Sequence, residues 1–599
     1  MAIIMISKQA GGSVFEGEID VCSIDELKNR GIIVVNAIGR TIALIHSDGK
    51  FFAIDNRCPH MGYPLSKGTV KDGVLTCHWH HARFDMHSGC TFDLFADDTE
   101  TFTVRASGDR VILIGGAELD SNDALQSSLD NRLVIGIDHS VDLVLAKSII
   151  REIDARGEEY GAIRVLELAS GIGASKLRGW GSGLTILTCM SNTLPYLDGE
   201  WKARALFKGV KHVAADAFQQ AVRPVFEPLS SVSEGDGFSF VTLSGWFRTF
   251  VEQREEDACQ RALLTVIRDF SREEIAEMLF AASTDHVFLE GGHVYDFLGK
   301  AFELLKTTGW HHAPDILPSL VKQLCNARRH EEDGSWRHPV DLIELIRAHE
   351  SKIPELLKPG RALNPSSEEI TKLAWTIISG EPQTVLDALD TVISDGWPVH
   401  DVALSLTLSA AFRIALFHRQ NEFGDWITVL HTLSYCNAVM NSSCIVASPE
   451  PVVKGIYHGA MKVFLDRFLN IPPADVGTAG RSHGQVGEFL SMLEHSMNSR
   501  DGDSVVHLID DCVGSGATNS AIVSSLARCV LREDAEFHTY QMLEATSNIL
   551  KNEKITADAQ RLMLIAAARY IGAHSPTDRA DQQVFDIALR LERGQSLHV

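Results

Sequence analysis

Four residues in the first hundred have the types and the spacing that an iron–sulfur site requires. Cys58 and His60 are separated by one residue, sixteen residues follow, and Cys77 and His80 are separated by two. Two thiolates and two imidazoles, presented in pairs from two loops, suit one [2Fe–2S] cluster, with the Cys pair on one iron and the His pair on the other. This pattern predicts a protein that moves electrons one at a time.

A zinc site is the alternative for the same four residues. Zinc sites with two Cys and two His usually pair like with like, as C-x₂₋₄-C and H-x₃₋₅-H. Here each pair mixes one Cys with one His. The spacing therefore favours the iron–sulfur cluster over zinc.

The residues around the two pairs resemble those of the Rieske family. Trp79-His80 is followed by Phe84-Asp85 and Gly89, as in the W-H-x-x-x-F-D-x-x-x-G run of Rieske ferredoxins and Rieske oxygenases. Rieske proteins of the respiratory cytochrome bc complexes carry an extra Cys in each loop, and these loops have none. The resemblance is therefore to the ferredoxin and oxygenase branch. It implies a midpoint potential in the lower part of the Rieske range of about −150 to +300 mV.

The pattern of residues 17–118 predicts a small all-β domain. Short apolar runs lie between Gly and Asp turns, and Asp48-Gly49 and Asp72-Gly73 are hairpin signals. Residues 119–134 are rich in Ser, Asn and Asp, and we expect a linker there. From 135 to 599 the apolar spacing is helical almost throughout. The fold class we expect is multidomain, with a small all-β Rieske domain followed by a large all-α domain.

Three segments of the all-α region look alike, and each has a histidine near its predicted helix start. His293, His431 and His538 each follow an acidic or turn-like stretch and precede an Ala by seven or eight residues. Their unequal spacing predicts degenerate helical repeats with insertions. Equivalent faces of stacked repeats come together, so we predict that the three imidazoles share one cavity and have a catalytic role. The alternative for any single one is a helix cap or a core residue.

The all-α region lacks the metal motifs of two known oxygenase classes. No two His residues after residue 100 lie five positions apart, as in ring-hydroxylating oxygenases. Glu290 and His293 form one E-x-x-H pair, whereas a di-iron bundle needs two. Further single candidates are His212, His338, His418 and His458.

The helical region also resembles the questin oxidase-like family, on the sequences around Gly292-His293 and Leu430-His431. That resemblance implies that such helices can host oxidation. The Gly171-Ile172-Gly173 run lacks the third Gly of a dinucleotide-binding motif. We therefore expect a separate NAD(P)H-dependent reductase or ferredoxin to be the electron donor.

Composition and charge indicate which binding partners and which cellular compartment to expect. The formal net charge of −24 argues against nucleic acid or an anionic membrane as a partner. No apolar run approaches the ~20 residues of a membrane helix, and the first fifteen residues lack a secretory signal. The eleven Cys residues show no disulfide spacing, which fits a reducing compartment. These features predict a cytoplasmic protein, and they leave a homo-oligomer open.

The sequence therefore predicts a Rieske-type oxidoreductase. Its [2Fe–2S] cluster would relay electrons to a His-lined site in the helical domain, where a small organic substrate is oxidised with O₂. The alternative is an electron-transfer module fused to a helical protein-binding scaffold that has no catalytic metal of its own. A nitrite-reductase-type component is a third option, although no sirohaem signature is present. Additional non-haem iron in the helical domain is left open by the sequence.

Overall fold

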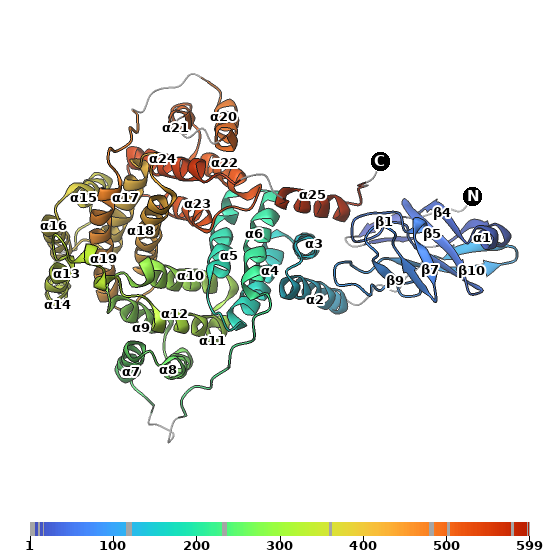
Figure 1. Ribbon diagram of the computed structural model, residues 1–599, viewed down its shortest axis with the longest axis horizontal. Coiled ribbons are helices and arrows are strands. Elements are labelled where there is room, and N and C mark those ends of the chain that lie inside the picture. The colour runs from blue at the N-terminus through green and yellow to red at the C-terminus, as the bar shows by residue number, and fades with distance from the viewer. Residues whose placement is uncertain are drawn as a thin grey trace. The chain divides into compact units, whose positions relative to one another are not determined.

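The chain divides into two compact units, an N-terminal unit (Met1–Leu168 and Ala580–Val599) and a helical unit (Ala169–Arg579). The computed structural model describes residues 6–9, 12–15, 17–114, 122–230, 237–358, 362–477, 484–499, 504–576, 580–595 and 597. Every strand of these described residues belongs to the N-terminal unit (Figure 1). The small β domain and the large helical region that the sequence predicts are therefore both present.

Two antiparallel sheets form the N-terminal unit. One has six strands in the order β3-β11-β10-β6-β5-β4, and the other has three in the order β7-β8-β9. β1 and β2 pair as a separate hairpin. The predicted turns at Asp48-Gly49 and Asp72-Gly73 join β5 to β6 and β7 to β8, with positive φ at all four residues. The strands are β1 (Ile6–Gln9), β2 (Gly12–Phe15), β3 (Glu18–Ser23), β4 (Ile32–Ala37), β5 (Arg40–Ser47), β6 (Lys50–Asp55), β7 (Thr69–Lys71), β8 (Val74–Thr76), β9 (Arg83–Asp85), β10 (Thr101–Ser107) and β11 (Arg110–Ile114).

Strand β5 is buried on both faces, and each face supports a separate core. Ile42 and Leu44 pack into one core, while Ala43 and Ile45 pack into the other. Alternation along the strand sends successive side chains to opposite faces. The second core also contains the predicted cluster ligands Cys58 and Cys77 and their neighbours. The cluster loops therefore rest directly on the sheet.

Helices complete the N-terminal unit, and one of them corrects the prediction of a linker at 119–134. That segment lies largely in α2, in which Leu133 and Ile137 are fully buried four residues apart. The polar residues that suggested a linker, among them Ser127, Ser128 and Asn131, form the exposed side of an amphipathic helix. The helices are α1 (Ile24–Arg30), α2 (Asn122–His139), α3 (Asp142–Arg156), the first part of α4 (Glu158–Ser175) and α25 (Asp581–Glu592).

The helical unit is organised around helices that are buried on most sides. Every residue of α17 from Asp401 to Ala415 is buried, and α17 packs against α15, α18, α19 and α24. A helix that is buried on every side belongs in the interior of a large unit. Helices α10, α18, α23 and α5 pack in a closed ring, each against the next and α5 against α10. The Gly171-Ile172-Gly173 run lies inside α4 rather than in a nucleotide-binding loop.

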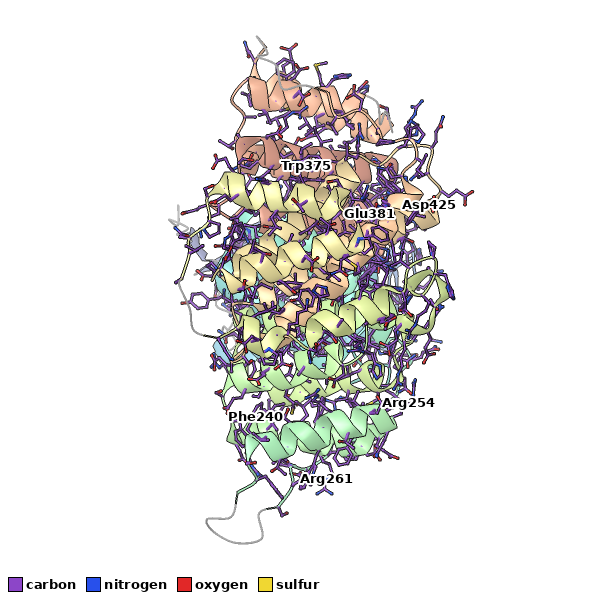
Figure 2. The ribbon with its side chains drawn as sticks, turned by 90° about the vertical axis from the view of Figure 1, so that its left-hand side faces the viewer. Phe240, Arg254, Arg261, Trp375, Glu381 and Asp425 are labelled. Carbon is purple, nitrogen blue, oxygen red and sulfur yellow. The ribbon has the colours of Figure 1, made fainter. Side chains whose placement is uncertain are left out.

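The remaining helices stack on this centre. Figure 2 shows the stack from one side, with Phe240, Arg254 and Arg261 at the end formed by α7 and α8, and Trp375 of α15 toward the other end. Among the described residues, no helix is long and apolar enough to cross a membrane. The helices are α5 (Ser182–Thr193), α6 (Glu200–Ala217), α7 (Phe240–Gln253), α8 (Glu256–Asp269), α9 (Arg272–Thr284), α10 (His293–Thr308), α11 (Ala313–Ile316), α12 (Val321–Asn326), α13 (Leu342–Glu350), α14 (Ile353–Leu356), α15 (Ser367–Ser379), α16 (Pro382–Ser394), α17 (Val399–Ala415), α18 (Phe423–Ser442), α19 (Glu450–Asp466), α20 (Val486–Ser499), α21 (Ser504–Gly514), α22 (Asn519–Leu531), α23 (Phe537–Ile549) and α24 (Ala557–Ala573).

Candidate functional site

The four predicted cluster ligands lie in two neighbouring loops of the N-terminal unit. Cys58 and His60 lie between β6 and β7, and Cys77 and His80 lie between β8 and β9. The side chains of Cys58 and Cys77 share a hydrogen bond. The ring centroids of His60 and His80 are 4.6 Å apart. The structure therefore brings the two Cys and the two His together as like pairs, although the sequence presents them as mixed pairs.

Two glycines allow the close backbone contacts that hold these loops. A Cβ at Gly68 would lie 2.4 Å from the carbonyl oxygen of Thr76, on the strand that leads into the second loop. Gly89 has a φ of +79°, and a Cβ there would lie 2.0 Å from the carbonyl oxygen of Thr99. No other residue fits either position without a shift of the backbone. Gly89 is also the last residue of the W-H-x-x-x-F-D-x-x-x-G run.

Backbone N–H groups of the same loops donate to both sulfur atoms. The hydrogen bond with Cys58 is the largest cause that lowers the pKa of Cys77 to about 6, and the backbone donors lower it further. Hydrogen bonds of this kind stabilise a thiolate, which is the form that binds iron. The donors are His60 and Met61 for Cys58, and Trp79 and His80 for Cys77.

The two imidazoles differ in exposure. His80 is exposed, whereas His60 is half-buried. Burial, and then the neighbouring His80, lowers the pKa of His60 to about 4. The Nδ1 atom of His60 is buried and has no hydrogen-bond partner within the described ranges. An uncharged ring nitrogen without a partner, beside two thiols, fits the ligand set of a Rieske [2Fe–2S] cluster.

A buried group of ion pairs beside His60 was not predicted from the sequence. The carboxylate of Asp97, 5% exposed, pairs with Lys147, with Arg132 at 2.6 Å and with Arg151 at 3.2 Å. Although burial opposes it, these three cations hold the pKa of Asp97 well below its usual range. Lys147 also donates to the carbonyl oxygen of the residue before His60, at 2.7 Å. The cations come from α2 and α3, so no local sequence signal connects them with the cluster.

The structure brings His293, His431 and His538 together in the helical unit. They lie on α10, α18 and α23, and one ring nitrogen of each lies within 4.8 Å of the other two. The Nε2 atoms of His431 and His538 are 2.8 Å apart. The ring centroids of His293 and His431 are 4.4 Å apart. The predicted convergence of three histidines that are far apart in the sequence is therefore observed.

One detail of that prediction is wrong. His293 and His538 lie in the first turn of their helices, but His431 lies two turns inside α18, which begins at Phe423. The turn-like stretch that precedes His431 is itself the start of α18. Glu422 caps this helix in a reciprocal pair of hydrogen bonds with Asp425, and such a capping box starts a helix.

A left-handed turn positions His293 at the first residue of α10. Phe288, Glu290, Gly291 and Gly292 have φ values of 53°, 48°, 66° and 94°. A Cβ at Gly291 would lie 3.5 Å from Nδ1 of His431, and a Cβ at Gly292 would lie 3.0 Å from the Phe288 ring. Positive φ at the two non-glycine residues costs conformational energy that the surrounding structure must offset.

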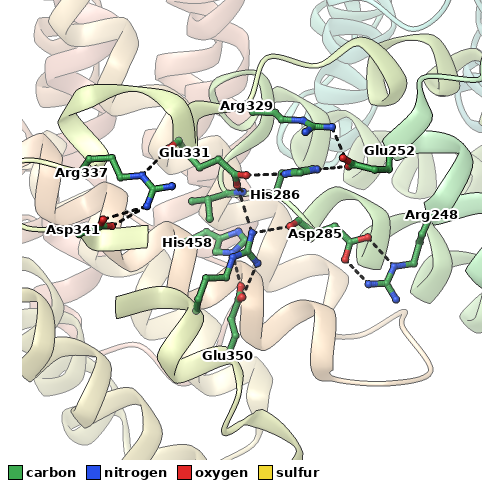
Figure 3. Close-up of polar contacts among 12 residues, drawn as sticks. Arg248, Glu252, Asp285, His286, Arg329, Glu331, Arg337, Asp341, Glu350 and His458 are labelled. Carbon is green, nitrogen blue, oxygen red and sulfur yellow. Dashed lines mark hydrogen bonds and ion pairs between the residues drawn. The ribbon is translucent and has the colours of Figure 1, made fainter. Parts of the chain in front are cut away.

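Ion pairs clamp the segment that precedes this turn (Figure 3). His286 lies between Glu331 and Glu252, with nitrogen–oxygen distances of 2.8 and 2.7 Å. The N–H of Val287 donates to Glu331 at 2.6 Å, and Arg329 pairs with Glu252 at 3.0 Å. The hydrogen bond with Glu331 raises the pKa of His286. Burial alone would raise the pKa of Glu331. The hydrogen bonds that His286 and the N–H of Val287 donate to its carboxylate outweigh burial and lower this pKa to about 2.

Glu536 orients His538. Its carboxylate accepts the backbone N–H of His538 at 3.0 Å and lies 2.5 Å from the Nδ1 atom of the same ring. The Nε2 atom of His538 is therefore the one that faces His431. Burial, followed by the neighbouring histidines, lowers the pKa of His293 to about 4 and also lowers that of His431. These two rings are uncharged at neutral pH, with a nitrogen lone pair available to a ligand.

Each of the three helices continues with polar side chains on the face that carries its histidine. Lys300 is 1% exposed and pairs with Glu303 at 2.9 Å and Glu544 at 2.8 Å. These residues recur at intervals of three, six to seven and ten after the histidines, a helical spacing that could have revealed them in the sequence. The polar stripe comprises Asp296, Lys300 and Glu303 of α10, Asn437 and Asn441 of α18, and Gln541, Glu544 and Asn548 of α23.

The other candidate histidines lie outside this group, and three of them have hydrogen-bond partners of their own. His212 lies 2.9 Å from Asp534, and His458 lies 2.9 Å from Glu350. His418 accepts the backbone N–H of Gln420, and His338 precedes a cis proline. The carboxylate of Glu290 accepts the N–H of Arg328 at 2.7 Å, so the Glu290–His293 pair does not act as a unit. None of these is part of the three-histidine group.

Residues 17–102 match the family model described as Rieske [2Fe-2S] domain. Among curated proteins, the ferredoxin component of the naphthalene 1,2-dioxygenase/salicylate 5-hydroxylase systems of Ralstonia sp. is 31% identical over 98 residues, which cover 16% of this chain and 92% of the relative. The 3-phenylpropionate/cinnamic acid dioxygenase ferredoxin subunit of Photorhabdus laumondii is 38% identical over 79 residues, or 13% of this chain and 74% of the relative.

A longer match joins the chain to apoptosis-inducing factor 3 of Mus musculus, with 30% identity over 149 residues and 22% of this chain. The match spans only 24% of that relative, and the same holds for its human counterpart. The family model ends at residue 102, before the helical unit begins. The resemblance of the helical region to the questin oxidase-like family stays a prediction.

Proposed function

Because the chain belongs to the Rieske [2Fe–2S] family through its N-terminal domain, we propose that its cluster relays single electrons to the site formed by His293, His431 and His538. At that site a small organic substrate is oxidised with O₂. The Rieske domain binds a [2Fe–2S] cluster and gives the chain its kinship with oxidoreductases. The electrons are then used at the three-histidine site in the helical unit.

In this proposal, Cys58 and Cys77 hold one iron of the cluster, and His60 and His80 hold the other. The cluster supplies one-electron transfer. The exposed ring of His80 provides the edge through which a donor delivers electrons. Two of the relatives are ferredoxin components of dioxygenase systems, which supports a separate NAD(P)H-dependent reductase or ferredoxin as the donor to this chain.

The observation that carries the proposal is the convergence of the three imidazoles. They come from helices whose histidines are 138 and 107 residues apart in the sequence, and they meet with ring nitrogens within 4.8 Å. Burying uncharged polar rings against one another gains little stability, because each ring gives up hydrogen bonds to water. Imidazole binds iron and acts as an acid or base in oxygen chemistry. A role at a reacting centre therefore explains the cluster of histidines better than a structural role does.

Oxygen uptake tests the proposal when a surrogate NADH-dependent reductase feeds electrons to the full-length protein. Cys58→Ser should abolish the cluster spectrum and the oxygen uptake. His431→Ala should keep the cluster spectrum but lower the uptake at least about tenfold, since it removes one group of the reacting site. His495→Ala, an exposed histidine of α20, is the matched control and should change neither.

A different outcome would favour a protein-binding scaffold. If His431→Ala consumes oxygen as fast as the unaltered protein while Cys58→Ser does not, electrons leave the cluster without passing through the helical unit. The helical unit would then dock a partner enzyme, and the proposed function would be rejected.

A further inference from the structure

The histidine group in the helical unit has more hydrogen-bonding capacity than its own members can satisfy. An uncharged imidazole has one N–H donor and one nitrogen lone pair. Nδ1 of His538 is taken up by Glu536, and its Nε2 faces Nε2 of His431 at 2.8 Å. The ring of His293 stands against both, with centroid distances of 4.4 Å to His431 and 6.0 Å to His538. Three ring nitrogens thus point toward one small volume.

We propose that His293, His431 and His538 bind one divalent first-row transition-metal ion. Two nitrogens that each lie about 2.1 Å from an ion, at a right angle, are about 3.0 Å apart. The 2.8 Å between the Nε2 atoms of His431 and His538 already matches that separation. The third nitrogen lies within 4.8 Å of both, so a small rotation of the His293 ring completes a three-nitrogen face.

The environment of His538 is the one that a metal-binding histidine needs. Metal-bound histidines usually pass their second N–H to a carboxylate, which fixes the tautomer and makes the other nitrogen a better donor. Glu536 makes this contact to Nδ1 of His538 at 2.5 Å and is itself held as the N-cap of α23. His538 is therefore oriented for binding through Nε2 before any ion arrives.

An independent observation indicates what occupies the rest of the site. Asp296 and Gln541 lie one helical turn after His293 and His538, and the Gln541 amide donates to Asp296, so these side chains link α10 and α23. Both side chains are buried, at 0% and 1% exposure. Yet Oδ1 of Asp296 and Oε1 of Gln541 have no hydrogen-bond partner among the described residues. These two oxygens can accept hydrogen bonds from water, including a water molecule bound to the metal.

The donor set favours one ion rather than two. Within the described residues, no carboxylate shares the 4.8 Å limit with these three imidazoles. A di-iron centre of the bundle type needs four carboxylates in addition to two histidines. Three nitrogen ligands leave open coordination positions, which is the arrangement of catalytic rather than structural metal sites. This inference extends the proposed function, but metal binding can be tested without it.

Metal analysis of the full-length protein provides the test. The protein is incubated with iron(II) without oxygen and desalted, and iron and acid-labile sulfide are counted per chain. We expect three irons and two sulfides per chain. Two of the irons and both sulfides belong to the cluster. His431→Ala and the more conservative His293→Gln should each remove the third iron and leave the other two. His495→Ala should retain all three.

Glu536→Gln separates a designed site from adventitious binding. It should weaken binding of the third iron about 10- to 100-fold in a chelator competition, because an amide orients the His538 ring less firmly. Equal affinity in this variant, or a third iron that persists in both His431→Ala and His293→Gln, would overturn the inference. A count of only two irons per chain in the unaltered, fully helical protein would also overturn the inference.

Failure of this inference and failure of the proposed function can be told apart. A third ion that binds through the histidines, while oxygen uptake is the same with and without His431, would leave the metal site standing and reject the electron relay. Uptake that depends on His431 with only two irons present would reject the metal site and leave the relay standing.

Discussion

At the scale of single residues, the cluster ligands are the part of the site that the sequence predicts best. Cys58, His60, Cys77 and His80 are close in sequence, and their types and spacing already predict the ligand set. The Asp97 group was missed because it depends on tertiary contacts between the β domain and α2 and α3. Lys147 lies seventy residues from the second ligand pair, in a helix with no motif.

The position of Lys147 leads to a prediction about the cluster potential. Its ammonium group donates to the carbonyl before His60 and is buried. Reduction adds negative charge to the cluster, and a nearby cation favours the reduced form. Lys147→Gln should therefore lower the midpoint potential by on the order of tens of millivolts. A redox titration followed by the visible spectrum measures it.

Lys50, an exposed lysine at the start of β6, serves as the control for that titration, and Lys50→Gln should leave the potential unchanged. The unaltered protein should itself titrate well below the upper Rieske limit of about +300 mV, because its loops have no disulfide. A higher potential in Lys147→Gln, or a value near that limit in the unaltered protein, would show that the electrostatic reasoning fails.

At the scale of elements, the left-handed turn before α10 is the feature that places His293. Gly292 has a φ of +94° and packs against Phe288 and Tyr435. Gly292→Ala should lower the free energy of unfolding by about 2 kcal/mol, from backbone strain plus the clash. Calorimetry of the full-length protein measures the change as a lower unfolding temperature.

Gly424→Ala is the matched control, and it should not lower the unfolding temperature. Gly424 lies in the first turn of α18, and nothing lies within 4 Å of the Cβ that this change would add. Alanine is favoured over glycine in a helix by up to about 1 kcal/mol, so the unfolding temperature should stay the same or rise. If Gly292→Ala and Gly424→Ala change the unfolding temperature in the same way, the positive φ and close packing of Gly292 do not constrain the turn.

The clamp that holds the preceding segment should depend on pH. The pKa of His286 is raised in the fold, so its contribution to stability is full below its ordinary pKa of about 6.5 and is lost as the pH rises through the raised value. The pKa of Glu331 is lowered to about 2, so its contribution is full above its ordinary value of about 4.3 and is lost as the pH falls toward 2. The clamp is therefore strongest between about pH 4.5 and 6.5.

Glu331→Gln tests this clamp. The difference in unfolding temperature between this variant and the unaltered protein should be largest near pH 5.5 and should shrink by pH 9. Glu252→Gln changes the more exposed partner of His286 and should have a smaller effect, because solvent screens that pair. A difference for Glu331→Gln that does not vary with pH would mean that His286 takes no part in the clamp.

Two predictions about helices were wrong. The segment 119–134 has the polar composition of a linker, but its buried Leu133 and Ile137 make it one side of a helix. The stretch before His431 looks like a turn because a capping box at Glu422 begins a helix there. In both cases composition alone could not show which polar residues face solvent and which start a helix. Packing against neighbouring helices decided the outcome.

At the scale of the whole molecule, the sequence predicts the order of a small β domain and a large helical region. It does not predict how the units are composed, since α2, α3 and α25 belong with the β domain. α25 comes from the far end of the chain, and only long-range packing could reveal that. Convergence of the three histidines was predictable from their similar surroundings, whereas the polar stripe that follows them was overlooked.

In the proposed relay, electrons held by the Rieske cluster leave it through the three histidines. It is tested most directly by reducing the cluster without oxygen, mixing the protein with oxygenated buffer in a stopped-flow instrument, and following the return of the oxidised spectrum. Reoxidation should be fast in the unaltered protein and in His495→Ala, and at least about tenfold slower in His431→Ala, whose cluster is intact. Equal rates in all three proteins would contradict it.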